Sequence, residues 1–339
     1  MGREVAILND RALHGSRILV TGAHGFIGMH VARAASRACA DVVGLVRDPR
    51  SDPKLDAGPI AYEQCDVADP DEVFGALQRY EPEIIVHAAG ATQRGKGREA
   101  WQANVASNVA TTLAVVAAAA AIAPDRRPVV VAPGSQREYG TAAMPWTEER
   151  SCEPVDAYGA TKLAATVLFL GARGSDLLNA SVVRLPIVFG PGQTTDMFVP
   201  ELIRNSLAGS PMRMTPGEQR RRFLFAPDAA AALLTVARRC RDGFAIGLLN
   251  APAYEPMTLR SFVERVVAVL GRTVDVTFGA IEYRPDERLD AWPDTSLAES
   301  MDPWLPLTPL DEALRETIDW FAASPAFVAR PEGGGDGGC

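Results

Sequence analysis

Several features that mark other classes of protein are scarce in this chain of 339 residues. Its five cysteines are scattered and form no CxxC pair, which predicts neither a disulfide framework nor a metal site. Scattered, unpaired cysteines of this kind favour a reducing, cytoplasmic location. Acidic residues outnumber basic ones by 42 to 34, and the net charge of −8 argues against nucleic acid as the main partner.

Long apolar segments are also scarce. The alanine-rich run 113–123 is too short to span a bilayer, and the opening MGREVAILND lacks the basic segment and apolar core of a secretory signal. We therefore expect no membrane partner. With 47% hydrophobic and 22% charged residues, the composition is that of a soluble globular protein. The glycine-rich tail 326–339 is expected to be disordered.

Short apolar runs alternate with helical stretches through the first half of the chain. Strands are expected at 17–21, 42–46, 84–88, 129–132 and 181–185. Helices are expected at 26–38, 69–80, 104–121 and 158–170. This alternation is typical of an α/β fold, a doubly wound parallel sheet covered on both faces.

The character of the sequence changes after about residue 190, where proline and arginine become more frequent and the elements shorter. We therefore divide the chain into a dinucleotide-binding domain over 16–190 and a mainly substrate-binding domain over 191–325. The second, a smaller C-terminal α/β domain, is expected at the carboxyl edge of the sheet, where ligands of open α/β sheets bind.

A glycine turn, TGAHGFIG, follows the first predicted strand. Gly22, Gly25 and Gly28 have the spacing GxxGxxG, looser than the GxGxxG of the dinucleotide fingerprint. Glycine lets the backbone approach a pyrophosphate closely, and the helix opening with Phe26 and Ile27 offers unpaired N–H groups to it. A plain turn between strand and helix is the simpler alternative.

The residues after the second strand, and those after a further strand expected just before Asp66, bear on the choice and binding of the cofactor. Arg47 comes first after the apolar run of the second strand and suits the 2′-phosphate of NADP, so NADP(H) is favoured. Asp48 follows it and keeps NAD(H) possible, since a carboxylate there binds the ribose hydroxyls. Asp66 and Val67 are placed to contact the adenine, although an ordinary loop is nearly as good an interpretation.

Tyr158 and Lys162, in DAYGATKLAA, are four residues apart on a predicted helix and so share one face. A neighbouring ammonium favours phenolate over phenol, so we expect Lys162 to lower the pKa of Tyr158 toward the working pH. A tyrosine tuned in this way exchanges a proton with an alcohol or sugar oxygen.

Together with the glycine turn, several segments in one order resemble the extended short-chain dehydrogenase/reductases, the NAD(P)-dependent nucleotide-sugar epimerase/dehydratase/reductase group. They extend over roughly 16–321 and include TGAHGFIG, CDVADPDEV, IVHAAG, GSQREYG, YGATK, VVRLPIVFGPGQ and MTPGEQRRRFLFAPD. The resemblance implies a Rossmann-type domain with a bound nicotinamide dinucleotide, contacted also by Ala88 and Ala89 of IVHAAG. It further implies a homodimer, paired through the helical stretches 104–121 and 158–170.

The resemblance also implies a role for each residue of a Ser–Tyr–Lys centre. Tyr158 is the acid/base, Lys162 holds the nicotinamide ribose, and Ser135 bonds the same substrate oxygen as Tyr158. Read without the resemblance, Ser135 is a helix cap. Asn104, in a segment similar to VNxxGT, shapes the site, and Gln136 is expected to contact the substrate.

In the second half, the resemblance implies that the partner is a nucleotide-diphosphate sugar. Arg221 matches the arginine that grips the diphosphate, and Arg222 stands where the family usually has aspartate. Arg284, in YRPDE, matches a second position near the diphosphate. Arginine suits this task because its planar fork makes paired hydrogen bonds to phosphate oxygens. Phe198 is expected near the base or sugar.

Departures from the family pattern bear on the reaction. Dehydratases carry Thr-Asp-Glu at the catalytic strand end, whereas this chain has Ser135, Gln136 and Arg137, and neither of the last two is a usable acid or base. The favoured function is NADPH-dependent reduction of an NDP-4-keto-6-deoxyhexose. The alternatives are an NAD-dependent 4-epimerase, a reductase of small ketones and a non-catalytic NADP-binding protein. Ile187 replaces the asparagine of RxxNxYG, which puts the usual substrate contacts there in doubt.

Overall fold

The computed structural model describes residues 13–49, 58–92, 97–272, 274–284, 287–301, 307–324 and 327, and the chain forms two compact units. The first unit comprises Met1–Pro186, Pro227–Pro252 and Pro293–Pro306. The second comprises Ile187–Ala226, Ala253–Trp292 and Leu307–Cys339. Each unit is therefore built from three segments of the chain. Of the predicted tail 326–339, only Phe327 lies among the described residues.

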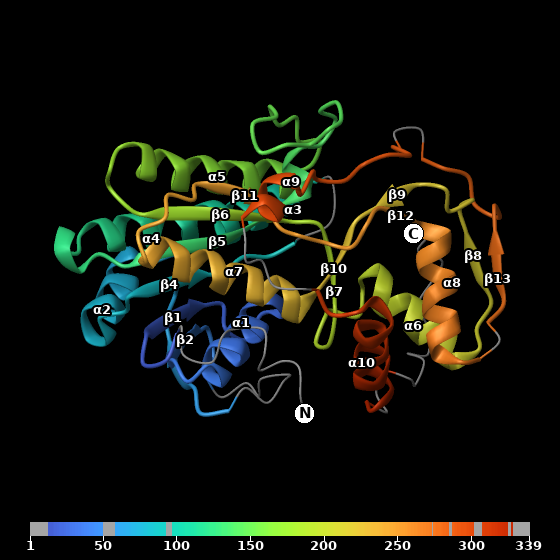
Figure 1. Cartoon of the computed structure of the whole chain (residues 1–339), viewed down its shortest axis with the longest axis horizontal. Helices are drawn as coiled ribbons and strands as arrows, with labels where there is room; N and C mark the ends of the chain where they lie inside the picture. Colours follow the sequence, from blue (N-terminus) through green and yellow to red (C-terminus); the bar gives the residue numbers. More distant parts are fainter. Residues whose placement is uncertain are drawn as a thin grey trace. The chain divides into compact units, whose positions relative to one another are not determined.

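A seven-stranded parallel sheet forms the centre of the first unit, in the order β11-β6-β5-β4-β1-β2-β3 (Figure 1). Its strands are β1 (Arg17–Thr21), β2 (Asp41–Val46), β3 (Ala61–Gln64), β4 (Ile84–His87), β5 (Val129–Ser135), β6 (Ala180–Leu185) and β11 (Leu248–Asn250). The strand order reverses between β1 and β4, and such a switch point is where open α/β sheets bind ligands, at the carboxyl ends of the strands.

Helices cover both faces of this sheet (Figure 1). They are α1 (Phe26–Arg37), α2 (Pro70–Tyr80), α3 (Arg98–Asn104), the π-helical turn η1 (Val105–Ala110), α4 (Thr111–Ala120), α5 (Ala157–Gly174), α7 (Ala226–Arg241) and α9 (Ser296–Ser300), with short 3-10 turns η2 (Pro124–Arg126) and η3 (Gln136–Glu138). Apolar side chains of α2, α4 and α5 pack with those of the central strands in one buried cluster. Helices α1 and α7 lie over the opposite face.

The helix over α3, η1 and α4 begins earlier than the predicted stretch 104–121. As a continuous helix of 23 residues, Arg98–Ala120, it is long and apolar enough to cross a membrane by length and composition alone. Half of its apolar window is buried inside the unit, where α4 packs against α2 and α5. A core helix of a globular protein passes the same test of length.

The second unit is smaller, and its described residues form short strands and helices. Its elements are β7 (Ile187–Phe189), α6 (Phe198–Ala208), β8 (Met212–Met214), β9 (Arg220–Arg221), β10 (Phe223–Phe225), β12 (Met257–Thr258), α8 (Leu259–Leu270), β13 (Val276–Phe278) and α10 (Leu310–Ala322). The strands form three two-stranded sheets, β10–β7, β12–β9 and β13–β8.

Aromatic rings fill the core of the second unit. The rings of Phe223 and Phe262 stack with centroids 3.8 Å apart, and Phe189 meets Phe262 edge-on at 5.7 Å. Phe321 of α10 contacts Phe327 at 4.3 Å. Because large rings bury much apolar area, this unit has a core of its own. The predicted fold class is confirmed, with a parallel Rossmann-type sheet and a smaller C-terminal α/β region.

Candidate active site

The glycine turn lies at the carboxyl end of β1 and has no room for side chains. Gly22 adopts φ +65°, and a Cβ there would stand 2.7 Å from the Cα of Ala89. A Cβ on Gly28 would stand 2.1 Å from the carbonyl oxygen of Gly22. The amide of Ala89 also donates to the Thr21 hydroxyl at 3.1 Å. With Gly25 as its N-cap, α1 begins without a capping side chain, so this cradle fits a pyrophosphate.

His87, at the end of β4, links the glycine turn to helix α4 through hydrogen bonds with Thr21 and Thr112. The Thr112 hydroxyl donates to the Asn108 carbonyl at 2.7 Å, so it accepts from His87 Nε2 at 3.3 Å. Nδ1 then accepts from the Thr21 hydroxyl at 2.9 Å. Burial, and next the charge of Lys162, lower the pKa of His87 to about 3. The imidazole is therefore neutral, with one tautomer fixed by its neighbours.

Ser135, Tyr158 and Lys162 also lie at the carboxyl edge of the parallel sheet, as the glycine turn does. Ser135 ends β5, and the other two lie one turn apart on α5. The side chains of Thr92 and Ser135 lie close enough to the Tyr158 phenol to favour its ionised form. The Lys162 ammonium donates to the Pro133 carbonyl at 2.6 Å. The structure thus brings together the three residues expected to form the centre, and it adds Thr92.

The expected electrostatic effect of Lys162 on Tyr158 is wrong for this structure. The pKa of Tyr158 is raised, because burial penalises the phenolate more than the nearby side chains of Thr92 and Ser135 favour it. Burial also lowers the pKa of Lys162, although the carboxylate of Glu138 opposes this. Desolvation exceeds the charge effects on both groups.

A buried ion pair stands behind Ser135. Glu138 Oε1 accepts from the Ser135 amide at 2.7 Å, and Oε2 accepts from Thr166 Oγ1 at 3.0 Å and from Arg184 Nε at 2.8 Å. The exposed fractions of the Glu138 and Arg184 side chains are 0% and 3%. Ser135 Oγ also accepts from the Arg137 amide at 3.2 Å, so this serine is both a helix cap and a partner of Tyr158. No sequence pattern predicts this pair, because a contact between residues 46 positions apart leaves no local pattern.

Asn104 and Asn108 occupy the helix behind the centre. Asn104 is fully buried, and its Nδ2 donates to the Ala100 carbonyl within the helix at 2.8 Å. Asn108, one turn later, extends out of the helix toward Ala91 and Thr161. Sequence reasoning selected Asn104 alone. A usable sign was that Asn108 stands where the VNxxGT pattern has threonine.

The remaining predicted cofactor residues lie along the carboxyl edge of the sheet. Phe26 and Ile27 form the first turn of α1, and Ala88 follows β4; all three are half-buried. Gln136 is buried behind Ser135, and its Oε1 has no hydrogen-bond partner among the described residues.

Charges at the end of β2 bear on the choice between NAD and NADP. Arg47 and Asp48 are both exposed just after the strand. The rings of His24 and Tyr62 lie 4.5 Å apart. Burial lowers the pKa of His24, and the charge of Asp48 partly offsets this, so His24 of the glycine turn lies near Asp48. Two basic side chains and one carboxylate therefore lie in the region that faces an adenosine ribose in the dinucleotide-binding arrangement.

Asp66 and Val67 follow β3. The amide of Asp66 donates to Glu72 Oε2 at 2.7 Å, and its Oδ1 accepts from the Ala68 amide at 3.0 Å. Asp66 is exposed, whereas the side chain of Val67 is buried in the core cluster. Because its side chain is buried, Val67 can contact a ligand only through its main-chain N–H and C=O groups.

The three predicted substrate residues Phe198, Arg221 and Arg284 belong to the second unit. Arg221 is mostly buried and pairs with Glu287 at 2.6 Å, and it also donates to the carbonyls of Arg220 and Arg288 at 2.7 and 2.9 Å. Its guanidinium is therefore held in a fixed orientation, unlike that of an arginine in a solvated run of charged surface residues.

Arg222, where the family usually has aspartate, turns inward and donates to the carbonyls of Ala253 and Tyr254 at 3.2 Å each.

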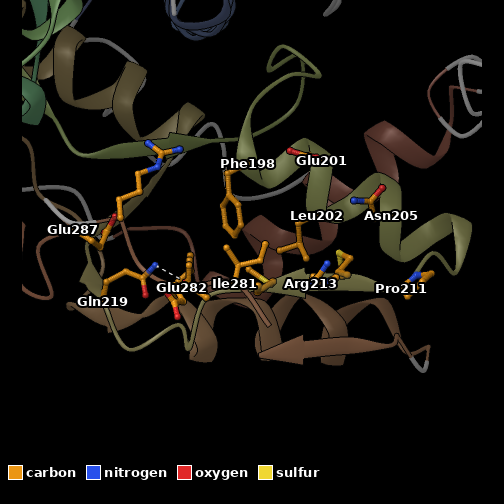
Figure 2. Close-up of a pocket in the computed structure, with 15 residues that line it drawn as sticks. Phe198, Glu201, Leu202, Asn205, Pro211, Arg213, Gln219, Ile281, Glu282 and Glu287 are labelled. Carbon is orange, nitrogen blue, oxygen red and sulfur yellow. Dashed lines mark hydrogen bonds between the residues drawn. The ribbon is translucent and has the colours of Figure 1, made fainter. Parts of the chain in front are cut away.

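A pocket of about 390 Å³ lies within the second unit, and Figure 2 shows the side chains around it. Phe198 and Glu201 of α6 line it together with Arg284 and Gln219. Gln219 Nε2 donates to Thr215 Oγ1 at 3.3 Å, while its buried Oε1 has no partner among the described residues. The pocket thus combines one aromatic face with polar groups, the composition of a small-molecule site.

Across the described residues, no cluster of three or more histidine, cysteine, aspartate or glutamate side chains is close enough to hold a metal ion.

Comparison with known proteins identifies the family. Over 325 residues the chain is 29% identical to dTDP-6-deoxy-L-talose 4-dehydrogenase (NAD(P)(+)) of Kitasatospora kifunensis, covering 93% of this chain and 98% of that protein. It is 26% identical to dTDP-glucose 4,6-dehydratase of Neisseria gonorrhoeae, covering 90% and 95%. UDP-glucuronic acid 4-epimerase of Bacillus cereus, solved with UDP-glucuronic acid and NAD, has the same fold with a TM-score of 0.76 at 22% identity, covering 90% and 98%. The model of the NAD dependent epimerase/dehydratase family matches residues 18–250, so the chain belongs to this family of nucleotide-sugar enzymes.

Proposed function

We propose that the protein is an NADPH-dependent reductase of a nucleoside-diphospho-4-keto-6-deoxyhexose. The observation that carries the proposal is the meeting of Ser135, Tyr158 and Lys162 at the carboxyl edge of the sheet, beside the glycine cradle. A bound nicotinamide dinucleotide supplies the hydride for such a reaction. The chain's own residues must then orient the ketone and supply one proton.

The protonation state of Tyr158 supports reduction. Because burial raises its pKa, the phenol keeps its proton at neutral pH, which is the form that protonates a ketone oxygen. The Ser135 hydroxyl bonds the same oxygen and orients the carbonyl. Lys162, held at the Pro133 carbonyl, offsets the negative charge left on the phenolate. An epimerase starts instead from the alcohol and needs the phenolate first.

Two further observations favour the reductase over the other reactions of the family. Gln136 and Arg137 follow Ser135 where a dehydratase needs an acid and a base, so elimination of water has no catalyst there. The Kitasatospora relative is named a 4-dehydrogenase, which is the same hydride transfer in reverse, and it accepts NAD(P)(+) by its name.

We propose NADP(H) as the preferred cofactor. Arg47 is exposed at the end of β2, and His24 lies close by in the glycine turn. The guanidinium of Arg47 suits a 2′-phosphate, and the imidazole of His24 can add a neutral hydrogen bond. The nearby carboxylate of Asp48 can bind the ribose hydroxyls of NAD, so we expect weaker binding of NAD as well.

We assign substrate binding to the second unit. Arg221, oriented by Glu287, and the exposed Arg284 are suited to a diphosphate, and Phe198 offers an aromatic face in the pocket. In the same scheme the first unit binds the dinucleotide. The substrate is thus a nucleotide-diphosphate sugar.

A homodimer and a cytoplasmic location complete the proposal. Trp101, Val105, Leu113 and Val167 are 46%, 45%, 55% and 59% exposed along the helix from α3 to α4 and on the neighbouring α5. Apolar side chains on two adjacent helices form a surface suited to a second copy of the chain. The four cysteines that the structure describes are free thiols, consistent with a reducing compartment.

The test is to measure the rate of NADPH oxidation by the purified protein with 4-keto-6-deoxyhexoses linked to dTDP, UDP, GDP or CDP. We expect turnover with one of them and retention of NADPH binding in Tyr158→Phe, with turnover lowered on the order of 10²–10⁴-fold. Tyr80→Phe is the matched control, because Tyr80 lies at the end of α2 and its hydroxyl bonds Glu63 instead of a residue of the centre.

Each alternative gives a different result. NAD that co-purifies with the protein, together with interconversion of the sugar at C4 without net use of NADPH, identifies a 4-epimerase. Dinucleotide binding without turnover of any nucleotide sugar identifies a reductase of smaller ketones or a binding protein. Full activity in Tyr158→Phe refutes the assignment of Tyr158.

A further inference from the structure

One face of α5 is anchored to the end of β5. The helix packs against β5 and β6 (Figure 1) and against the short turn η3. Tyr158, Lys162 and Thr166 follow one another at intervals of four residues, so they share this face. The Lys162 ammonium donates to the Pro133 carbonyl at 2.6 Å, and Thr166 Oγ1 donates to Glu138 Oε2 at 3.0 Å. The face that carries the catalytic pair is therefore bonded to the strand end at two further points.

The carboxylate of Glu138 joins this face of α5 to Ser135. Its Oε1 accepts from the Ser135 amide at 2.7 Å, while Oε2 accepts from the Thr166 hydroxyl. A carboxylate is planar and rigid, so two contacts through its two oxygens fix the separation of the groups that they join. The side chains of Glu138 and Thr166 are buried, and water cannot replace either contact. The place of Ser135 relative to α5 thus depends on one side chain.

Arg184 of β6 fixes this carboxylate from a third element. Its Nε donates to Glu138 Oε2 at 2.8 Å, and hydrogen bonds between charged groups are stronger than those between neutral ones. The guanidinium itself lies over the Tyr139 ring at 4.5 Å. Because Arg184 keeps Glu138 ionised and oriented, both oxygens remain acceptors for Ser135 and Thr166.

Local geometry at the end of β5 brings the carboxylate back under the strand. Ser135 is the N-cap of η3 and Glu138 stands at its third position, so the two residues form a capping box. Gly134 makes room for it, since a Cβ there would stand 2.8 Å from Glu138 Oε1 and 3.0 Å from Arg184 Cγ. A short turn thus places a buried carboxylate between Ser135 and α5.

We propose that Glu138 is a positioning residue of the active site, which holds Ser135 in place beside the face of α5 that carries Tyr158. The inference rests on the proposed function, because it concerns two residues of that reaction. Ser135 orients the ketone only where its hydroxyl and the Tyr158 phenol reach the same oxygen, and a displacement of about 1 Å costs up to about 100-fold in rate. A purely structural ion pair predicts instead a less stable protein with unchanged turnover while it is folded.

The first test changes Thr166, because this leaves the ion pair of Glu138 and Arg184 intact. Thr166→Val removes the hydroxyl and keeps the shape, whereas Thr166→Ser keeps the hydroxyl. Below the temperature at which any variant unfolds, we expect kcat to fall on the order of tenfold in Thr166→Val and to keep its wild-type value in Thr166→Ser. The Kd of NADPH should not change. Thr317→Val is the control, since the buried Thr317 hydroxyl donates only within α10, to the Ala313 carbonyl at 2.7 Å.

The second test separates the position of the carboxylate from its charge. Glu138→Asp keeps the negative charge, but its side chain is one CH₂ group shorter and cannot reach both Ser135 and Thr166. We expect kcat to fall at least as far as in Thr166→Val. Adding Thr166→Val to Glu138→Asp should lower kcat no further, because Thr166 acts only through that carboxylate. If Glu138→Asp does not fold, the changes at Thr166 still decide.

A spectroscopic test needs no substrate. In protein made with tyrosine labelled with carbon-13 at Cζ, the NMR signal of Tyr158 reports the surroundings of its phenol, which include the Ser135 side chain. This signal is identified by its loss in Tyr158→Phe. Thr166 lies about 12 Å further along the helix, too far to affect the phenol directly. We expect the signal to move in Thr166→Val and to stay in place in Thr166→Ser and Thr317→Val.

Either of two results overturns the proposal. One is an unmoved Tyr158 signal in Thr166→Val, and the other is a wild-type kcat in that variant. The rate is measured for whichever nucleotide sugar the protein reduces or epimerises, because both reactions use Ser135 and Tyr158. A protein that epimerises but does not reduce would refute the proposed function and still test Glu138. The NMR signal tests Glu138 without any turnover, so the two failures are distinguishable.

Discussion

Replacement of Glu138 by glutamine is the change whose effect can be worked out most fully from the structure. The carboxylate is fully buried, and its oxygens accept from the Ser135 amide, from Thr166 and from Arg184. Glutamine keeps one carbonyl oxygen for the Ser135 amide. Its NH₂ group would face the donors of Arg184 and Thr166, and the guanidinium would remain buried without a counter-charge.

The expected cost follows from the burial of both partners. Removing one member of a buried ion pair costs about 3–5 kcal/mol, because the remaining charge loses its partner but stays out of water. At roughly 2–4 °C per kcal/mol for a domain of this size, the midpoint of thermal unfolding should fall by roughly 6–20 °C. The stacking of Arg184 over Tyr139, at 4.5 Å, does not replace the lost charge.

The matched control is Glu81→Gln, which removes the same charge from an exposed pair with Arg126. That pair has a similar separation of 3.0 Å, but its side chains are 60% and 64% exposed, so solvent screens it and little stability depends on it. Both variants are measured by circular dichroism during heating. If Glu138→Gln lowers the midpoint no more than Glu81→Gln does, the reasoning about the buried pair is refuted.

Two further changes test the substrate arginine and the buried histidine. Arg221→Ala should raise KM for the nucleotide sugar roughly 10–100-fold and leave the NADPH Kd unchanged, because charge-assisted bonds to phosphate are lost; Arg220→Ala, exposed in the same triplet, is the control and should leave KM unchanged. His87→Gln should flatten the loss of stability between pH 6.5 and about 3. The buried imidazole gains a proton only near the lower value and the unfolded one near 6.5, so wild-type stability is complete above 6.5 and falls by up to about 1.4 kcal/mol per pH unit below it. Equal KM values for the two arginine variants, or parallel pH curves for wild type and His87→Gln, would contradict these expectations.

Local patterns were enough to predict most of the sheet. The strand predicted at 84–88 is β4 (Ile84–His87), and the helix predicted at 26–38 is α1 (Phe26–Arg37). Apolar runs bounded by turn residues carry this information in the sequence itself. Strand β5 extends three residues beyond the predicted 129–132, to Ser135, because ladder pairing with β6 continues across Pro133 and Gly134.

Contacts between distant residues were beyond the reach of the same reasoning. Two examples are the ion pair of Glu138 with Arg184 and the hydrogen bonds of Asn108 with Ala91. Both form only in the folded protein, and no spacing in the sequence predicts them. The lowered pKa expected for Tyr158 failed for a related reason. Charge can be seen in a sequence, but the burial that outweighs it here cannot.

Transfer of deuterium from NADPH labelled at the transferring position tests the central claim most directly. The protein is incubated with the labelled cofactor and the nucleoside-diphospho-4-keto-6-deoxyhexose that it consumes, and the product is analysed by mass spectrometry and proton NMR. The account predicts one deuterium at C4 of the sugar for each NADPH oxidised, and loss of this transfer in Tyr158→Phe. A sugar that changes configuration at C4 without taking up label from added NADPH would contradict it.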